Sequence, residues 1–272
     1  MFALRVGAAA FGGLALGFLG GMVGFGQGRS LLLLVYWVAE DPINAPGTNN
    51  AVTIMASATG SWSHFREGRV AFGVLALMGI PSVVGAFLGG FYGGLVPRAI
   101  LLVFVGLIGI AYSYTLLTDR GGGHQNRRKL SPAESDSAWQ VRAPVTRVSG
   151  GQRLKAISLS FAIGLLGGMV GLGLGQLRLP TMLRVLGLDP RIAVGTSLAI
   201  GTLTGCFGFL GRVLHLQVDW AVLAILGPMA VLGSYIGAQQ TGKISPQRLM
   251  RLMGVVIGTG SVLLFWLAYT QL

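Results

Sequence analysis

Residues 20–28 read GGMVGFGQG, and residues 167–175 read GGMVGLGLG, so one glycine-rich stretch occurs twice in the chain. The repeat continues beyond the glycines. Asp-Pro at 41–42 returns at 189–190, and Gly-Thr at 47–48 returns at 195–196. Further on, glycines at 79, 85 and 89 correspond to glycines at 227, 233 and 237. The chain is therefore built from two copies of one unit, offset by 147 to 148 residues.

The composition is that of a membrane protein. Hydrophobic residues make up 53% of the 272 residues and charged residues only 10%, whereas about 25% is usual for a soluble domain. The long apolar stretches are each near the roughly 20 residues that cross a hydrocarbon core. They are residues 6–26, 47–62, 70–94, 99–117, 156–173, 193–211, 220–238 and 252–267. We predict an all-α polytopic membrane protein, with about four to five apolar segments in each half.

Several classes of function are excluded. The net charge of +12 suggests nucleic acid, but eight of the twenty basic residues lie in 120–155 without interleaved aromatic residues. Basic loops of membrane proteins normally set orientation. The single cysteine, Cys206, allows no intramolecular disulfide, and no metal-ligand spacing or cofactor motif is present. No Ser-His-Asp set or buried carboxylate pair supports an enzyme, so we expect neither catalysis, nor a cofactor, nor a metal.

The halves are separated by a polar segment. Residues 118–153 are basic and rich in Gly, Ser and Pro, which predicts a flexible linker between repeats at 1–117 and 154–272. Within each repeat a short apolar piece, 31–39 or 179–188, follows the glycines. As a helix such a piece rises only ~15 Å. It is either a re-entrant half-helix or a short crossing, so we predict glycine-broken, re-entrant or discontinuous helices.

Loop charges favour inverted repeats. If each half crosses the membrane an odd number of times and the linker is cytoplasmic, seven basic loop residues lie inside and three outside. An even number of crossings would place four inside and six outside. The positive-inside rule therefore predicts inverted repeats with both termini outside.

The repeated glycines have two interpretations. Gly85/Gly89, Gly233/Gly237 and Gly254/Gly258 have the spacing of close helix packing, which we expect there. The alternating glycines at 24–28 and 171–175 break helical continuity and expose backbone groups that must line a cavity or be buried. Glycine-interrupted apolar segments at matching positions in two halves mark the substrate site in secondary transporters. We favour that role for these two stretches.

The Gly-Thr segments precede apolar spans. At Gly47-Thr48-Asn49-Asn50 and Gly195-Thr196-Ser197, Thr, Asn and Ser are natural helix N-caps. A helix N-terminus also attracts anions, so two such starts from inverted repeats are expected to converge near the midplane. We give equal weight to two roles for these residues, capping a helix and binding the anion.

Two arginines lie close to the glycine breaks. Arg29 follows the first break; Gln176 takes its place in the second, with Arg178 two residues later. A charge at membrane depth is costly and indicates a partner for an anion, unless the side chain snorkels to the interface. Every Asp and Glu lies outside the apolar spans, which disfavours a cation path. His64 and His215 are expected in loops, in contact with water.

These motifs resemble those of the sulfite exporter TauE/SafE family. The second half follows the family pattern closely, with its glycines, Pro180, Ala193 to Ser197 and Val218-Asp219-Trp220. The first half departs from it, with Gln27 for a glycine, Leu33 for the proline, Asn49-Asn50 for Ser-Leu and no Asp-Trp after Arg69. The resemblance implies transport of a small, often sulfur-containing anion such as sulfite, sulfoacetate or another organosulfonate.

We therefore predict a secondary transporter, an exporter in direction, of a small anion in the inner membrane of a bacterium. A non-transporting scaffold is the alternative, disfavoured by the polar residues at the breaks. The expected partners are the anion and the lipid bilayer; the sequence indicates no oligomeric state. The predicted substrate-binding residues are Gly24, Gly26, Gln27, Gly28, Arg29, Gly47, Thr48, Asn49, Asn50, Gly171, Gly173, Gly175, Gln176, Arg178, Gly195, Thr196 and Ser197.

Overall fold

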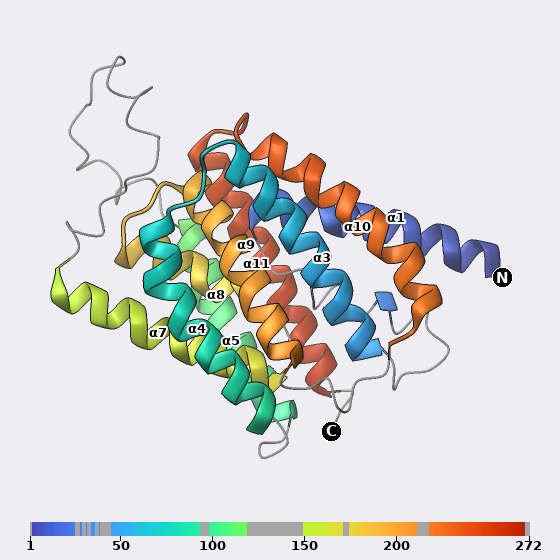
Figure 1. Cartoon of the computed structure of the whole chain (residues 1–272), viewed down its shortest axis with the longest axis horizontal. Coiled ribbons are helices and arrows are strands. Elements are labelled where there is room, and N and C mark those ends of the chain that lie inside the picture. The colour runs from blue at the N-terminus through green and yellow to red at the C-terminus, as the bar shows by residue number, and fades with distance from the viewer. Residues whose placement is uncertain are drawn as a thin grey trace.

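The computed structural model describes residues 2–24, 28, 31, 34–35, 38, 45–92, 98–118, 149–170, 174–210 and 218–269. This part of the chain folds into a bundle of helices with no strand, which confirms the predicted all-α class (Figure 1). In the first half the long helices are α1 Phe2–Val23, α3 Ala45–Arg66, α4 Phe72–Tyr92 and α5 Arg98–Thr118. In the second half they are α7 Gly150–Val170, α9 Pro190–Leu210, α10 Trp220–Thr241 and α11 Pro246–Tyr269. The short helix α8, Gly175–Pro180, and the π-helical segment η2, Thr181–Val185, lie between α7 and α9.

The outer surface is suited to a bilayer. Among the described helices, α4, α9 and α10 are long and apolar enough to cross a membrane, and Gly7–Val23 and Val103–Thr118 are shorter apolar helical stretches. Large apolar side chains point outward, among them Phe91 at 68% exposure and Trp220 at 75%. Water would penalise such a surface, whereas lipid tails do not.

Helix α1 packs along α10 through small residues. Gly17 lies against Ala230, and one helical turn later Gly21 lies against Ser234. A Cβ atom at Gly21 would come within 2.1 Å of the Ser234 carbonyl oxygen, so the two backbones are in direct contact. Both residue numbers increase together, which means that α1 and α10 run in the same direction.

The second half repeats this contact with the partners exchanged. Gly164 and Gly168 of α7 lie against Ser82 and Ala86 of α4, the residues that correspond to Ala230 and Ser234. From the other side, a Cβ at Gly89 would meet the backbone of α7. The expected packing role of Gly85/Gly89 and of Gly233/Gly237 is therefore confirmed. The first long helix of each half therefore packs against the third long helix of the other half.

Corresponding helices run in opposite directions. Thr48 and Ala56 of α3 contact Asp219 and Ser234 of α10, so α3 runs with α10 and α1. In contrast, Gly60 of α3 lies against Leu198 while His64 lies against Gly195, so α3 and α9 are antiparallel. Helices α5 and α11 are antiparallel as well, with Gly106 near Phe265 and Leu117 near Gly254. An exchange of the two halves therefore reverses the direction of every long helix.

The short segment of the second half crosses the bundle. Gly168, near the end of α7, lies against Ala86, whereas Thr196, near the start of α9, accepts a hydrogen bond from Ala71 at the start of α4. Helices α7 and α9 run in the same direction, so the chain between them returns from one end of the bundle to the other. A re-entrant hairpin would have made them antiparallel. The six residues of α8 and the five of η2 belong to a short, discontinuous crossing.

The predicted linker lies mostly outside the described residues. Helix α5 ends at Thr118, and α7 begins at Gly150, so residues 150–153 are helical although we assigned them to the linker. Residues 119–148, which include the cluster of basic residues, are not described. The division into repeats at 1–117 and 154–272 therefore stays a prediction.

Candidate functional site

The two glycine breaks meet at Ser197 of α9. The Ser197 hydroxyl lies 3.2 Å from the carbonyl oxygen of Gly24 and 3.4 Å from that of Gly175. Gly24 has a φ of 72°, and a Cβ there would come within 2.7 Å of the Cα of Val194. Both the left-handed backbone and the close approach require glycine at this position. Three predicted site residues from different parts of the sequence are thus brought together.

Arg178 of α8 is buried inside the protein. Its side chain is 1% exposed, so it does not snorkel to an interface. Nη2 donates a hydrogen bond to Thr204 Oγ1 at 3.0 Å, and the Thr204 hydroxyl donates to the Ile200 carbonyl oxygen at 2.9 Å. Nε and Nη1 are buried and have no hydrogen-bond partner in the described part of the chain. The guanidinium is therefore held on one side and has donors left on the others.

The Arg178–Thr204 pair lies at the centre of the bundle. Helix α9 crosses α3 with Leu198 against Gly60 and Gly205 against Ile54. These contacts bring residues 55–56 opposite 203–204, and the same residues correspond to one another in the repeat. Thr204 is therefore near the middle of the crossing of the two helices. In secondary transporters the substrate site lies at this level, at the interface of the repeats.

Acidic side chains of the described residues lie at helix ends, away from Arg178. Asp219 accepts hydrogen bonds from the backbone N–H groups of Ala221 and Val222 and caps α10. Asp189 accepts from the Arg191 N–H just before α9, and Glu67 pairs with Arg69 between α3 and α4. The same residues contain no group of three or more side chains able to hold a metal ion. Within this part of the chain, Arg178 has no carboxylate as counterion.

The Gly-Thr segments are not the helix starts that we expected. Helix α3 begins at Ala45 and α9 at Pro190, so Thr48 and Thr196 lie inside the helices. A proline is favoured in the first turn of a helix, which moves the start of α9 upstream of the Gly-Thr pair. Because α3 and α9 are antiparallel, their N-termini lie at opposite ends of the crossing. The expected convergence of two helix N-termini near the midplane is therefore wrong.

The two threonines connect the halves instead. Thr48 Oγ1 accepts a hydrogen bond from the Asp219 N–H at 2.8 Å, and Thr196 Oγ1 accepts from the Ala71 N–H at 3.0 Å. Ala71 and Asp219 correspond to one another in the repeat, so these two bonds are equivalent. Each bond fixes the residue before the third helix of one half to the second helix of the other.

The remaining predicted residues have mixed outcomes. Asn49 is 1% exposed, and its Oδ1 has no partner among the described residues, while Asn50 is half-buried. Gly28, Gly47 and Gly195 are buried, and Gln176 lies in α8. Gly26, Gln27, Arg29, Gly171 and Gly173 lie outside the described residues, so their placement stays a prediction.

His64 is a buried residue that the sequence analysis placed in a loop. It is 0% exposed near the end of α3, and its Nε2 lies 3.1 Å from the Gly21 carbonyl oxygen of α1. In the loop that follows, burial and, to a smaller extent, the charge of Arg191 together lower the pKa of Arg69 to about 10. The sequence signal was the position of His64 one turn after Gly60, on the face of α3 that contacts α9. His215 lies outside the described residues.

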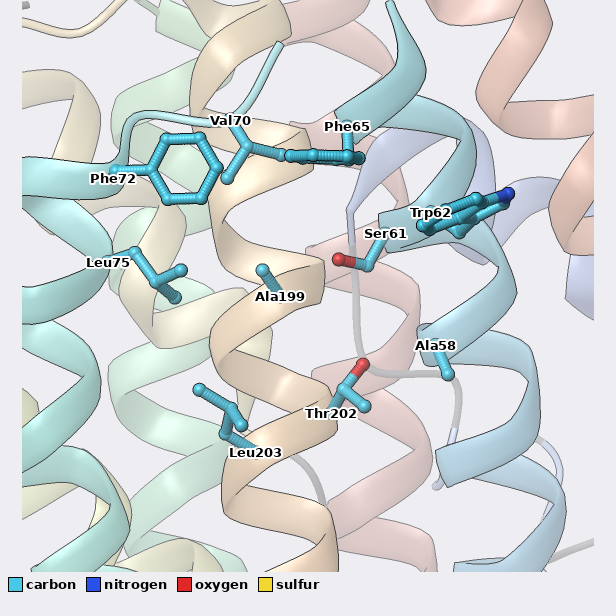
Figure 2. Close-up of a pocket in the computed structure, with 10 residues that line it drawn as sticks. All are labelled: Ala58, Ser61, Trp62, Phe65, Val70, Phe72, Leu75, Ala199, Thr202 and Leu203. Carbon is cyan, nitrogen blue, oxygen red and sulfur yellow. The ribbon is translucent and has the colours of Figure 1, made fainter. Parts of the chain in front are cut away.

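An apolar groove lies on the opposite side of α9. It has a volume of about 360 Å³, and it is lined by Trp62 and Phe65 of α3, Phe72 and Leu75 of α4, and Leu203 of α9 (Figure 2). Ala199, which also lines the groove, is on the far face of the helix from Ser197 and Thr204, which contact the glycine breaks and Arg178. None of the predicted site residues lines this groove.

Comparisons with known proteins identify a family and several relatives. The profile of the family described as sulfite exporter TauE/SafE matches residues 9–264. The probable membrane transporter protein YunE of Bacillus subtilis is 26% identical over 255 residues, covering 90% of this chain and 92% of that protein. A probable membrane transporter protein of Xylella fastidiosa is 26% identical over 277 residues, covering 99% and 97%.

No solved structure matches the chain. The family profile covers the repeated glycines, the Gly-Thr segments and Arg178, and it spans both halves of the bundle. The chain therefore belongs to the sulfite exporter TauE/SafE family and is a membrane transporter.

Proposed function

We propose that this protein is a secondary transporter that exports a small anion, and that Arg178 is the fixed positive charge that binds it. The family description supports sulfite or another sulfur-containing anion as the cargo. The observation that carries the proposal is a fully buried guanidinium with Nε and Nη1 unpaired among the described residues. Alternating access would come from one repeat rocking against the other.

The energetics of Arg178 favour a ligand. A charge buried without a counterion costs several kcal/mol, even after the protein relaxes around it. Two unpaired donors add about 1–3 kcal/mol each, more when the group is charged. Thr204 supplies only one neutral acceptor, at 3.0 Å. An anion beside the guanidinium would compensate the charge and pair one of the free donors, which is a reason for an otherwise unfavourable residue to occupy the core.

Space for the anion lies beside Gly201. Among the described residues, a methyl group added at Gly201 would have Nη1 of Arg178 as its nearest neighbour, at 3.8 Å, with no other neighbour within 4 Å. The backbone of α9 is thus bare next to an unpaired donor. Ser197, one turn before Gly201 on the same face of α9, contacts both glycine breaks. An anion bound there would contact both α8 and α9, so its binding could affect the position of both helices.

Thermal unfolding of the purified protein with a panel of anions tests the proposal. The panel contains sulfite, thiosulfate, sulfonates, sulfate, carboxylates and chloride. A ligand at about 100 times its dissociation constant should add roughly 2.7 kcal/mol to the free energy of unfolding. We expect one class of anions to stabilise the wild type and to have no effect on Arg178→Gln. A panel without effect on the wild type would contradict the proposal and favour the scaffold alternative.

Gly201→Ala is the sharper variant. Its methyl group has no neighbour closer than 3.8 Å in the part of the chain that the structure describes, so the fold should be unchanged while the space beside Nη1 is filled. We expect anion stabilisation to weaken at least about tenfold in affinity, the equivalent of 1.4 kcal/mol. Gly208→Ala on the same helix is the matched control, because among the described residues its methyl would contact Ala86 alone, at 3.9 Å. Equal binding by both variants would place the anion elsewhere.

A further inference from the structure

We infer that the site at Arg178 takes a singly charged anion and rejects doubly charged ones. This inference rests on the proposed function, and it specifies the charge class of the substrate. Among the charged side chains whose burial the structure describes, Arg178 and Arg69 are the two that are buried. Arg69 lies in the loop after α3 and is paired with Glu67. One positive charge is therefore available at the centre of the described bundle.

Charge balance favours a monoanion. One negative charge beside the guanidinium forms a neutral pair, which the low-dielectric interior tolerates best. A dianion would leave one negative charge uncompensated at the level where α3 and α9 cross. Among the described residues the other buried charge, Arg69, lies in the loop after α3, whereas Thr204 lies near the middle of the crossing of α3 and α9.

The available hydrogen-bond donors point the same way. The hydroxyl of Thr204 donates to the Ile200 carbonyl, and that of Ser197 lies against the carbonyls of Gly24 and Gly175. Neither hydroxyl hydrogen is directed toward an anion. The donors left among these residues are Nε and Nη1 of Arg178. Nε and Nη1 face different edges of the planar guanidinium, so one small anion beside Gly201 can accept from Nη1, whereas a dianion needs more donors for its more basic oxygens.

This donor set defines the substrate chemistry. Sulfonates, hydrogensulfite and monocarboxylates carry one charge shared by two or three oxygens, which matches the single positive charge of the guanidinium. Sulfate and thiosulfate carry two charges. For sulfite, which gains its first proton near neutral pH, the bound species would be the protonated monoanion. The affinity for total sulfite should therefore increase as the pH falls.

Methanesulfonate and sulfate form the matched pair for the test, because a methyl group replaces one charged oxygen. Titrations use the purified full-length protein in detergent at low ionic strength, followed by thermal unfolding. We expect methanesulfonate to bind at least about tenfold more tightly than sulfate, and Arg178→Gln to bind neither. Sulfate binding as tightly as methanesulfonate would overturn the inference and leave the proposed function standing. Binding of neither anion by the wild type would overturn both.

A pH series gives a second, independent readout. Sulfite affinity should rise as the pH is lowered through neutrality, whereas methanesulfonate affinity should stay constant, which controls for titration of the protein. A sulfite affinity that rises with pH would overturn the inference. The remaining test concerns Arg29, which lies outside the described residues. If the wild type prefers sulfate and Arg29→Gln prefers methanesulfonate, two charges share the site and the inference is wrong.

Discussion

The two halves of the molecule share a scaffold but differ at its centre. In the repeat, Leu31 corresponds to Arg178 and Ala56 corresponds to Thr204. Leu31 and Ala56 are both 0% exposed and belong to one apolar cluster, whereas Arg178 and Thr204 form a buried polar pair. The first half therefore fills this position with ordinary packing. The equivalent position of the first half carries no charge, so the charge in the second half calls for another reason, which we propose is anion binding.

Replacing Arg178 with leucine makes the second half like the first at this position. Of the changes considered, it should have the largest effect on the free energy of unfolding. Without anion, Arg178→Leu should be about 1–3 kcal/mol more stable than the wild type, because the buried charge and its unpaired donors are removed. Thr204 keeps its bond to the Ile200 carbonyl. The roughly 2.7 kcal/mol of stabilisation by saturating anion should vanish. Denaturant unfolding with and without anion measures both.

The sign of the first effect separates binding from structure. A functional residue often lowers the stability of the wild type, because its site is selected for activity rather than for folding, so its replacement stabilises the protein. If Arg178→Leu were instead less stable without anion, the guanidinium would hold the fold together. It would then have a partner outside the described residues. Leu31→Ile, a change of shape in the equivalent apolar position, controls for repacking alone.

Equal effects are expected where the halves are alike. A Cβ at Gly237 would come within 2.0 Å of the Phe18 carbonyl oxygen, and one at Gly89 within 2.0 Å of the Leu165 carbonyl oxygen. Gly237→Ala and Gly89→Ala should each destabilise the protein by about 2 kcal/mol, because the backbones must separate. Denaturant unfolding of the two variants in one detergent compares them directly.

A position on α4 provides the control for this pair. At Gly79 an added methyl would meet its nearest neighbour at 3.6 Å, an ordinary contact, so Gly79→Ala should leave the free energy of unfolding nearly unchanged. If Gly89→Ala and Gly237→Ala differed by more than about 1 kcal/mol, the two interfaces would not be equivalent.

Much of the scaffold could be predicted from the sequence, because it is encoded in local spacing. Glycines at intervals of four lie on one face of a helix, so the spacing of Gly85/Gly89 and of Gly233/Gly237 is sufficient to predict a close helix contact. The duplication itself indicates that the contact occurs twice. The spacing does not predict which helix each glycine pair contacts. Each pair packs on a helix of the other half, and that choice depends on the tertiary fold.

The errors at the candidate site have physical causes of the same kind. The Gly-Thr pairs were placed at helix starts because Thr and Asn are good caps, but Pro190 starts α9 earlier and places Thr196 in the second turn. His64 was placed in a loop because hydropathy falls after Trp62, whereas a bond to the Gly21 carbonyl lets it be buried. For Arg178 the sequence left snorkelling and binding open, because burial of α8 depends on the helices around it.

The smallest expected difference between the halves concerns the two threonine bonds. Thr196→Val and Thr48→Val keep the side-chain shape and remove the acceptor for one backbone N–H each. The Ala71 N–H is buried, so its loss of partner should cost about 1–2 kcal/mol. The Asp219 N–H is partly buried and can turn to water, so Thr48→Val should cost less, about 0.5 kcal/mol. Amide hydrogen exchange should accelerate at Ala71 in one variant and at Asp219 in the other. A larger cost for Thr48→Val would mean that exposure of the N–H does not set the difference, and that the two halves are joined unequally at these bonds.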